Sequence, residues 1–190
     1  MFRARAVPWI VSLVSIPCLL LLVLPGCSSD SAPRSSLVVQ SVNDNAVLSS
    51  DVYSNGADEL YGTEDDNIPE EQIPITLRND PHDADLGMHT NGPFSSVALE
   101  RYEVRYSGGA VLPTYGGAMH LIVPSGSTAS ATIVVLPGSY KIAPPLDALV
   151  AGGEVTLNAE IVLFGVEEDS GDRVTAHANL SINVANWADK

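Results

Sequence analysis

Cysteine, histidine and basic residues are scarce in this 190-residue chain, and their scarcity excludes several kinds of site. Two cysteines, Cys18 and Cys27, and four histidines are too few for a thiolate zinc site, and no CxxCH motif is present to attach c-type haem. Nine basic residues stand against 23 acidic ones, which gives a formal net charge of −14. Because so acidic a surface repels phosphate groups, the sequence predicts no nucleic-acid partner.

Sequence motifs of catalysis are also missing. No GxSxG stands at a strand-to-helix turn, and no glycine-rich phosphate loop precedes a helix. Carboxylates are plentiful, but nothing in their spacing places two of them across a cleft. The sequence therefore predicts a protein that is not an enzyme and needs no organic cofactor.

The first 26 residues have the three-part pattern of an export signal. Arg3 and Arg5 give a positive start, and residues 6–24 contain no charged side chain. Pro25 and Gly26 cannot continue a helix, so the backbone after the apolar run is predicted to be open to a peptidase.

The stretch Leu24-Pro25-Gly26-Cys27 resembles the lipobox of bacterial lipoproteins, in which a leucine stands three places before a cysteine and a small residue directly precedes it. The resemblance implies that diacylglycerol joins Cys27 through a thioether, that the signal is removed, and that the new amino terminus is acylated. Two or three acyl chains anchor a protein firmly in a membrane, because each buried methylene contributes roughly 0.8 kcal/mol to the free energy of membrane binding. Ser28 stands where aspartate would favour the inner membrane, which implies the outer membrane in a host with two membranes.

The predicted organisation is a signal peptide at 1–26, a lipidated cysteine with a serine-rich tether at 27–36, and one domain at 37–187. Removing the signal leaves seven of the nine basic residues against 23 acidic ones, a formal net charge of −16. A plain secretory signal is one alternative. An uncleaved membrane-spanning helix is the other, because the uncharged run approaches the ~20 residues that a span requires.

Alternating apolar and polar residues predict β-strands along most of residues 37–187. Residues 155–163 and 174–184 alternate throughout, and a polar, glycine-containing loop at 165–172 joins them into a hairpin. Residues 97–106 place tyrosine and valine on one face and charged residues on the other, as in a sheet with one face in water.

Further strands are predicted at 37–42, 46–53, 73–79, 118–123 and 131–136, and one helical turn at 146–150. Pro74 marks the strand at 73–79 as an edge strand. Seven or eight strands without a helical period predict an all-β fold, an antiparallel immunoglobulin-like β-sandwich, and a closed barrel is the alternative.

One acidic segment offers ligands for calcium. Asp58, Glu64, Asp65 and Asp66 supply carboxylate oxygens, which calcium binds in sets of about six to eight. Their spacing does not match an EF-hand loop, and acidic runs are commonly solvated. A solvated surface loop is the simpler interpretation, and calcium is the metal that this segment would bind.

Two further loops and a set of tyrosines carry groups that could bind ligands. In the loop 80–94, zinc or manganese could be shared by His82, Asp83, Asp85 and His89. The hairpin tip carries Glu167, Glu168, Asp169 and Asp172, which could hold a metal or simply discourage strand pairing. A sugar-stacking or peptide-binding patch could form from Tyr102, Tyr106, Tyr115 and Tyr140, although two of these fit core or rim positions.

The sequence predicts a lipid-anchored cell-envelope protein that acts by binding or assembly. Its expected partners are the membrane, through the lipid on Cys27, and a protein of the envelope. The loops 54–72, 80–94 and 165–172 are the candidate contact surfaces, since sandwiches place function on loops. The alternatives are a metal-dependent envelope enzyme that uses the 80–94 loop and a structural subunit of a surface complex.

Overall fold

The computed structural model describes residues 34–54, 64, 66–82 and 96–187. The chain divides into two compact units, Met1–Asp30 and Ser31–Lys190, and every described residue belongs to the second. The predicted signal, Cys27 and most of the tether therefore lie outside the described residues. No helix within the described ranges is long and apolar enough to cross a membrane.

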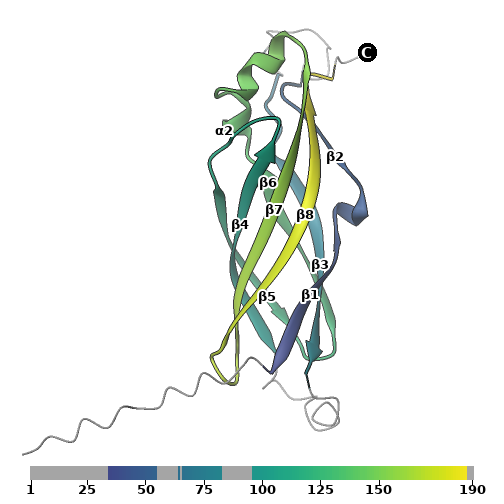
Figure 1. Cartoon of the computed structure of the whole chain (residues 1–190), viewed down its shortest axis with the longest axis vertical. Coiled ribbons are helices and arrows are strands. Elements are labelled where there is room, and N and C mark those ends of the chain that lie inside the picture. The colour runs from purple at the N-terminus through teal and green to yellow at the C-terminus, as the bar shows by residue number, and fades with distance from the viewer. Residues whose placement is uncertain (1–33, 55–63, 65, 83–95, 188–190) are drawn as a thin grey trace, which may run out of the picture. The chain divides into compact units, whose positions relative to one another are not determined.

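Eight strands form two sheets that pack face to face (Figure 1). The first sheet has the order β1 (Ser35–Val42), β3 (Glu71–Pro81), β6 (Thr128–Leu136). The second has the order β2 (Leu48–Asp51), β8 (Arg173–Ala185), β7 (Glu154–Glu167), β4 (Val97–Gly108), β5 (Tyr115–Val123). The only helices in the described part are short: η1 (Asn43–Asn45), α2 (Gly138–Lys141) and η3 (Leu146–Ala151). The predicted all-β, immunoglobulin-like sandwich of seven to eight strands is confirmed, and the helical turn at 146–150 with it.

One pairing departs from the predicted antiparallel pattern. β2 runs parallel to β8, whereas the other five strand pairings are antiparallel. The chain reaches β2 through η1, where Asn43, Asp44 and Asn45 all have positive φ angles. Asparagine and aspartate tolerate this left-handed conformation better than most residues. The chain thereby leaves the first sheet without reversing and joins the second sheet alongside β8.

The predicted edge position of the strand that contains Pro74 is wrong. β3 is the central strand of its sheet, between β1 and β6. The pairing with β1 ends at Ile75, so Pro74 has a strand neighbour only on the β6 side. On the β1 side the missing N–H of the proline therefore costs no ladder hydrogen bond, which reconciles Pro74 with a central strand.

The core lies between the inward faces of the two sheets and follows the predicted alternation. In β3 the inward residues Ile73, Ile75 and Leu77 are completely buried. β7 contributes Leu157, Ile161 and Leu163 from the opposite sheet, also completely buried. β7 continues with the same alternation beyond the predicted strand, to Glu167, so that the hairpin loop is shorter than the predicted 165–172.

Candidate functional site

A buried carboxylate holds the first described strand against the β7–β8 hairpin. Glu167 is only 2% exposed, although the sequence predicted that it lies in the polar hairpin loop 165–172. Its Oε1 accepts hydrogen bonds from the backbone N of Ser35 at 2.7 Å and from Ser35 Oγ at 2.5 Å. Its Oε2 accepts one from Ser170 Oγ at 2.9 Å. Because residue 167 continues the inward-facing row of β7, the side chain points into the protein rather than into solvent.

The hydrogen bonds of this clamp (Ser35, Glu167 and Ser170) keep the carboxylate ionised. Burial works to raise the pKa of Glu167, but hydrogen bonds from Ser35 and Ser170 outweigh burial, and the pKa lies below its ordinary value of 4.5. Just outside the clamp, Arg34 Nη1 pairs with Asp169 Oδ2 at 3.1 Å across an exposed surface. The start of β1 is therefore fixed to the hairpin at this end of the sandwich (Figure 1).

The opposite end of the sandwich contains a buried lysine. Lys141, the last residue of α2, is completely buried. Its Nζ donates to the backbone oxygen of Asp51 at 2.7 Å and pairs with Glu71 Oε1 at 2.7 Å. Burial lowers the pKa of Lys141 below its ordinary value of 10.5, and the contact with Glu71 opposes this shift. The ammonium group joins α2 to the end of β2 and the beginning of β3.

The outer face of the second sheet carries a row of alternating charges. Glu103 lies between two arginines, with Arg101 Nη1 at 2.6 Å and Arg105 Nη2 at 3.0 Å from its oxygens. The hydrogen bonds from Arg101 and then Arg105 lower the pKa of Glu103. The row continues through Glu160, which lies 3.9 Å from Arg105 and 3.4 Å from His177 Nδ1.

Next to this row, a groove of about 430 Å³ lies between two arginines. The guanidinium of Arg101 stacks 3.6 Å above the centre of the Phe164 ring, and Arg173 lines the groove from β8. Guanidinium groups beside an aromatic ring suit a planar or acidic ligand group. Glu100 also lines the groove, so its walls are of mixed charge.

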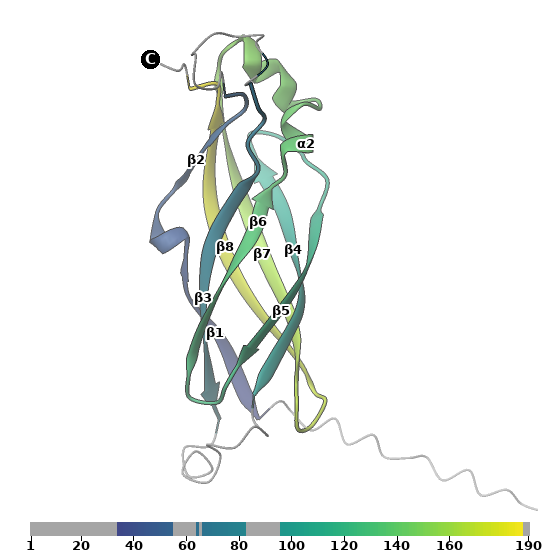
Figure 2. The same ribbon diagram turned by 180° about the vertical axis from the view of Figure 1, so that it is seen from behind.

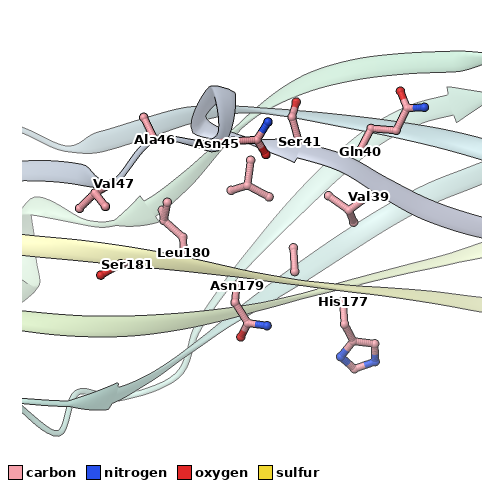
Figure 3. Close-up of a pocket in the computed structure, with 12 residues that line it drawn as sticks. Val39, Gln40, Ser41, Asn45, Ala46, Val47, His177, Asn179, Leu180 and Ser181 are labelled. Atoms are coloured by element: carbon pink, nitrogen blue, oxygen red, sulfur yellow. The ribbon is translucent and has the colours of Figure 1, made fainter.

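A second groove, of about 380 Å³, opens between β1 and β8 (Figure 3). Figure 3 shows Val39 pointing toward β8, whereas His177 and Asn179 point away from β1. The remaining lining is mostly amide, hydroxyl and aliphatic groups, including Gln40 and Asn45. This groove offers hydrogen bonds to a neutral ligand and no charged group at its centre.

The four tyrosines form one connected cluster between the sheets. Tyr102 packs against Tyr115, Tyr115 against Tyr140, and Tyr140 against Tyr106, with ring centres 6.1–6.3 Å apart. The hydroxyl of Tyr102 accepts from Val134 N at 3.0 Å, and that of Tyr106 donates to the Val135 oxygen at 2.7 Å. The core interpretation therefore holds for Tyr102 and Tyr106, whose hydroxyl groups bond the backbone of β6.

The predicted metal ligands are only partly within the described residues. Asp58, Asp65, Asp83, Asp85 and His89 lie outside them. Of the others, Glu64 is exposed, the Asp66 carboxylate accepts from Tyr53 Oη at 2.7 Å, and exposed His82 donates its backbone N–H to Arg34 O at 2.8 Å. Among the described side chains, no three His, Cys, Asp or Glu gather as they would around a metal ion. The calcium and zinc sites stay predictions.

Sequence reasoning missed Glu167 and Lys141, the two buried ionisable groups that fix the ends of the sandwich. For Glu167 a signal was present, because position 167 continues the odd-numbered inward row of residues 155–165. Lys141 gave no such signal, since its partner Glu71 lies 70 positions away in the sequence.

The sequence matches no family model, and it matches no curated protein. A solved structure described as a "putative late embryogenesis abundant (LEA) protein" is similar at 12% sequence identity, covering 83% of this chain and 75% of that chain with a TM-score of 0.43. So distant a likeness carries no functional information.

Proposed function

We propose that the chain is an envelope lipoprotein whose β-sandwich is a non-catalytic binding or assembly module. In this proposal Cys27 carries the lipid, and the tether ends at Arg34 rather than at the predicted residue 36, because Ser35 and Ser36 belong to β1. The supporting observation is the clamp of Ser35 by Glu167, which fixes one end of the sandwich beside the point where the tether enters.

In this proposal the clamped end of the sandwich is the membrane-near end, and the opposite end is the membrane-distant end. Eight residue steps separate Cys27 from Ser35, a reach of at most roughly 28 Å when fully extended. The hairpin at 168–172 lies at the clamped end. β8 runs for 13 residues from this end to the other, which corresponds to roughly 40 Å.

The membrane-distant end is the preferred contact surface for a partner protein. Among the described residues, three of the six exposed large hydrophobic side chains follow elements that end there: Val111 after β4, Ile142 after α2 and Trp187 after β8. The loop 54–72, one of the predicted contact surfaces, also leaves from this end, between the end of β2 and the start of β3. Aromatic and apolar side chains of this kind are typical of partner-binding surfaces.

The anchor is tested by expressing the chain in a bacterium and comparing Cys27→Ser with Cys18→Ser. We expect intact-mass spectrometry of the parent and of Cys18→Ser to show loss of residues 1–26 and the added mass of diacylglycerol. Cys27→Ser should keep its leader and gain no lipid. An intact leader with an unmodified Cys27 thiol in the parent protein would refute the lipoprotein proposal.

The contact surface is tested by cross-linking in membranes, with Trp187→Ser and Ile142→Ser as the variants. We expect both to lose a cross-linked envelope partner that the parent protein retains. The matched control is Val38→Ser, because Val38 is 42% exposed, similar to Trp187 at 41%, but lies on β1. Equal loss of cross-linking in all three variants would argue against the membrane-distant end.

A further inference from the structure

The edge strand β5 lacks two of the features by which natural proteins protect the edge of a sheet, proline and charged side chains. It is the last strand of the five-stranded sheet, pairs only with β4, and contains neither proline nor lysine (Figure 2). The surrounding segment, residues 107–140, contains no Asp, Glu, Lys or Arg, although the chain has 32 such residues. An exposed edge of this kind offers a row of backbone N–H and C=O groups to another strand.

The other strand edges are interrupted or occupied. β1 has an irregular pairing between Val39 and Ser41 and then leaves its sheet through η1. β6 has its backbone at Val134 and Val135 bonded by the hydroxyls of Tyr102 and Tyr106. β2 is four residues long and ends in Asp51. β5 has one irregularity in its pairing with β4, between Ala118 and Leu121, but its outward and inward residues alternate over its whole length.

We infer that β5 pairs antiparallel with β5 of a second copy of this chain, forming a two-fold symmetric dimer with one continuous sheet. Charge favours self-association at this edge, since two copies with a net charge of −14 repel each other less where they meet through uncharged strands. The outward side chains are small or neutral, so a second backbone can approach: Gly116, Ala118, His120 and Ile122. When β5 pairs antiparallel with β5 of a second copy, the unpaired backbone N–H and C=O groups of both copies gain hydrogen-bond partners. The inference does not depend on lipidation.

The dimer is tested by sedimentation velocity of the full chain in detergent of matched density. The variant is Ala118→Lys combined with Ile122→Lys, both at exposed outward positions of β5. Like charges facing each other across the two-fold axis should raise the dimer dissociation constant by at least roughly tenfold. The control is Asn158→Lys, an exposed outward position on β7, whose two edges are already paired. We expect this control to dimerise like the parent protein.

A second measurement on the unaltered chain keeps the test decisive if the variant misfolds. Amide hydrogen exchange of β5 should slow as protein concentration rises, whereas exchange in β7 should not change with concentration. A parent chain that is monomeric at its highest soluble concentration would overturn the inference. A dimer that survives the two lysines, or β5 exchange independent of concentration, would overturn it equally.

Discussion

The two ends of the sandwich contain buried ionisable groups that are stabilised in opposite ways. Glu167 at the clamped end and Lys141 at the other end are 2% and 0% exposed. Both have a pKa below the ordinary value of their side chain. For an acid, a lowered pKa means that the fold favours the charged form. For a base, it means that the fold disfavours the charged form.

The partners explain the difference. Glu167 accepts hydrogen bonds from three neutral donors, which stabilise a carboxylate without bringing a second charge out of water. Lys141 is paired with a carboxylate, Glu71, and the attraction between the charges does not fully offset the desolvation of the ammonium group. Neutral donors thus accommodate a buried charge better here than an ion pair does.

The largest expected effect comes from breaking the ion pair. Lys141→Ala leaves Glu71 without its cation and creates a cavity, so we expect a loss of about 3–5 kcal/mol in the free energy of unfolding. Urea unfolding of the purified chain measures it. The double variant Lys141→Met with Glu71→Gln removes both charges and should recover most of the loss. A double variant as unstable as Lys141→Ala would show that the pair itself is strongly stabilising.

The clamp should be somewhat less costly to remove. Glu167→Ala leaves the N–H and hydroxyl of Ser35 without their acceptor, and we expect a loss of about 2–3 kcal/mol in urea unfolding. Glu168→Ala is the control, because the neighbouring Glu168 is exposed. If both variants lost equal stability, net charge at the hairpin rather than the clamp would be responsible.

The pH dependence of stability should separate the two ends by its pH window, since stability rises with pH in acid because of Glu167 and in alkali because of Lys141. Because the folded pKa of Glu167 lies below 4.5, its contribution is present above the unfolded pKa and is lost as pH falls through the folded pKa. Because the folded pKa of Lys141 lies below 10.5, the unfolded state binds more protons between the two values, and stability rises with pH there.

Two variants would show which residue causes each slope, when the free energy of unfolding is measured at a series of pH values. Glu167→Gln should reduce the pH dependence of the free energy of unfolding only in the acid range (the acid limb). Lys141→Met should reduce it only in the alkaline range (the alkaline limb). A variant that changed the opposite limb would show that other groups control that slope.

The sequence predicted the layers of the fold better than its connections. Alternation in residues 155–163 and 174–184 is a local property, so strands and core faces followed from it. The parallel pairing of β2 with β8 depends on the left-handed turn at residues 43–45 and on where the second sheet lies, which no local pattern contains. The edge position predicted from Pro74 was wrong for the same reason, because only the tertiary pairing shows that β1 ends opposite Ile75.

The candidate site was less predictable than the fold, since buried charge depends on distant partners. The sequence predicted one polar hairpin tip for the acidic run at 167–169, yet Glu167 is buried whereas Glu168 and Asp169 are exposed. Composition describes all three residues equally, and only the alternation of β7 distinguishes them. Lys141 and Glu71 are brought together by the fold alone.

The smallest expected effect separates exposed from buried charge at the same end of the sandwich. Arg34 and Asp169 are 65% and 37% exposed, so water already solvates both groups and salt screens their attraction. We expect Arg34→Ala to change the free energy of unfolding by less than about 1 kcal/mol in urea, and the change should shrink further as salt is added. In a double-mutant cycle with Glu167→Ala, the two losses should add, because the Arg34 side chain pairs with Asp169 and only the Arg34 backbone, which Arg34→Ala keeps, interacts with Glu167. A coupling comparable to the loss from Glu167→Ala itself would instead make the exposed pair part of the clamp, since holding Ser35 in place would then require both contacts.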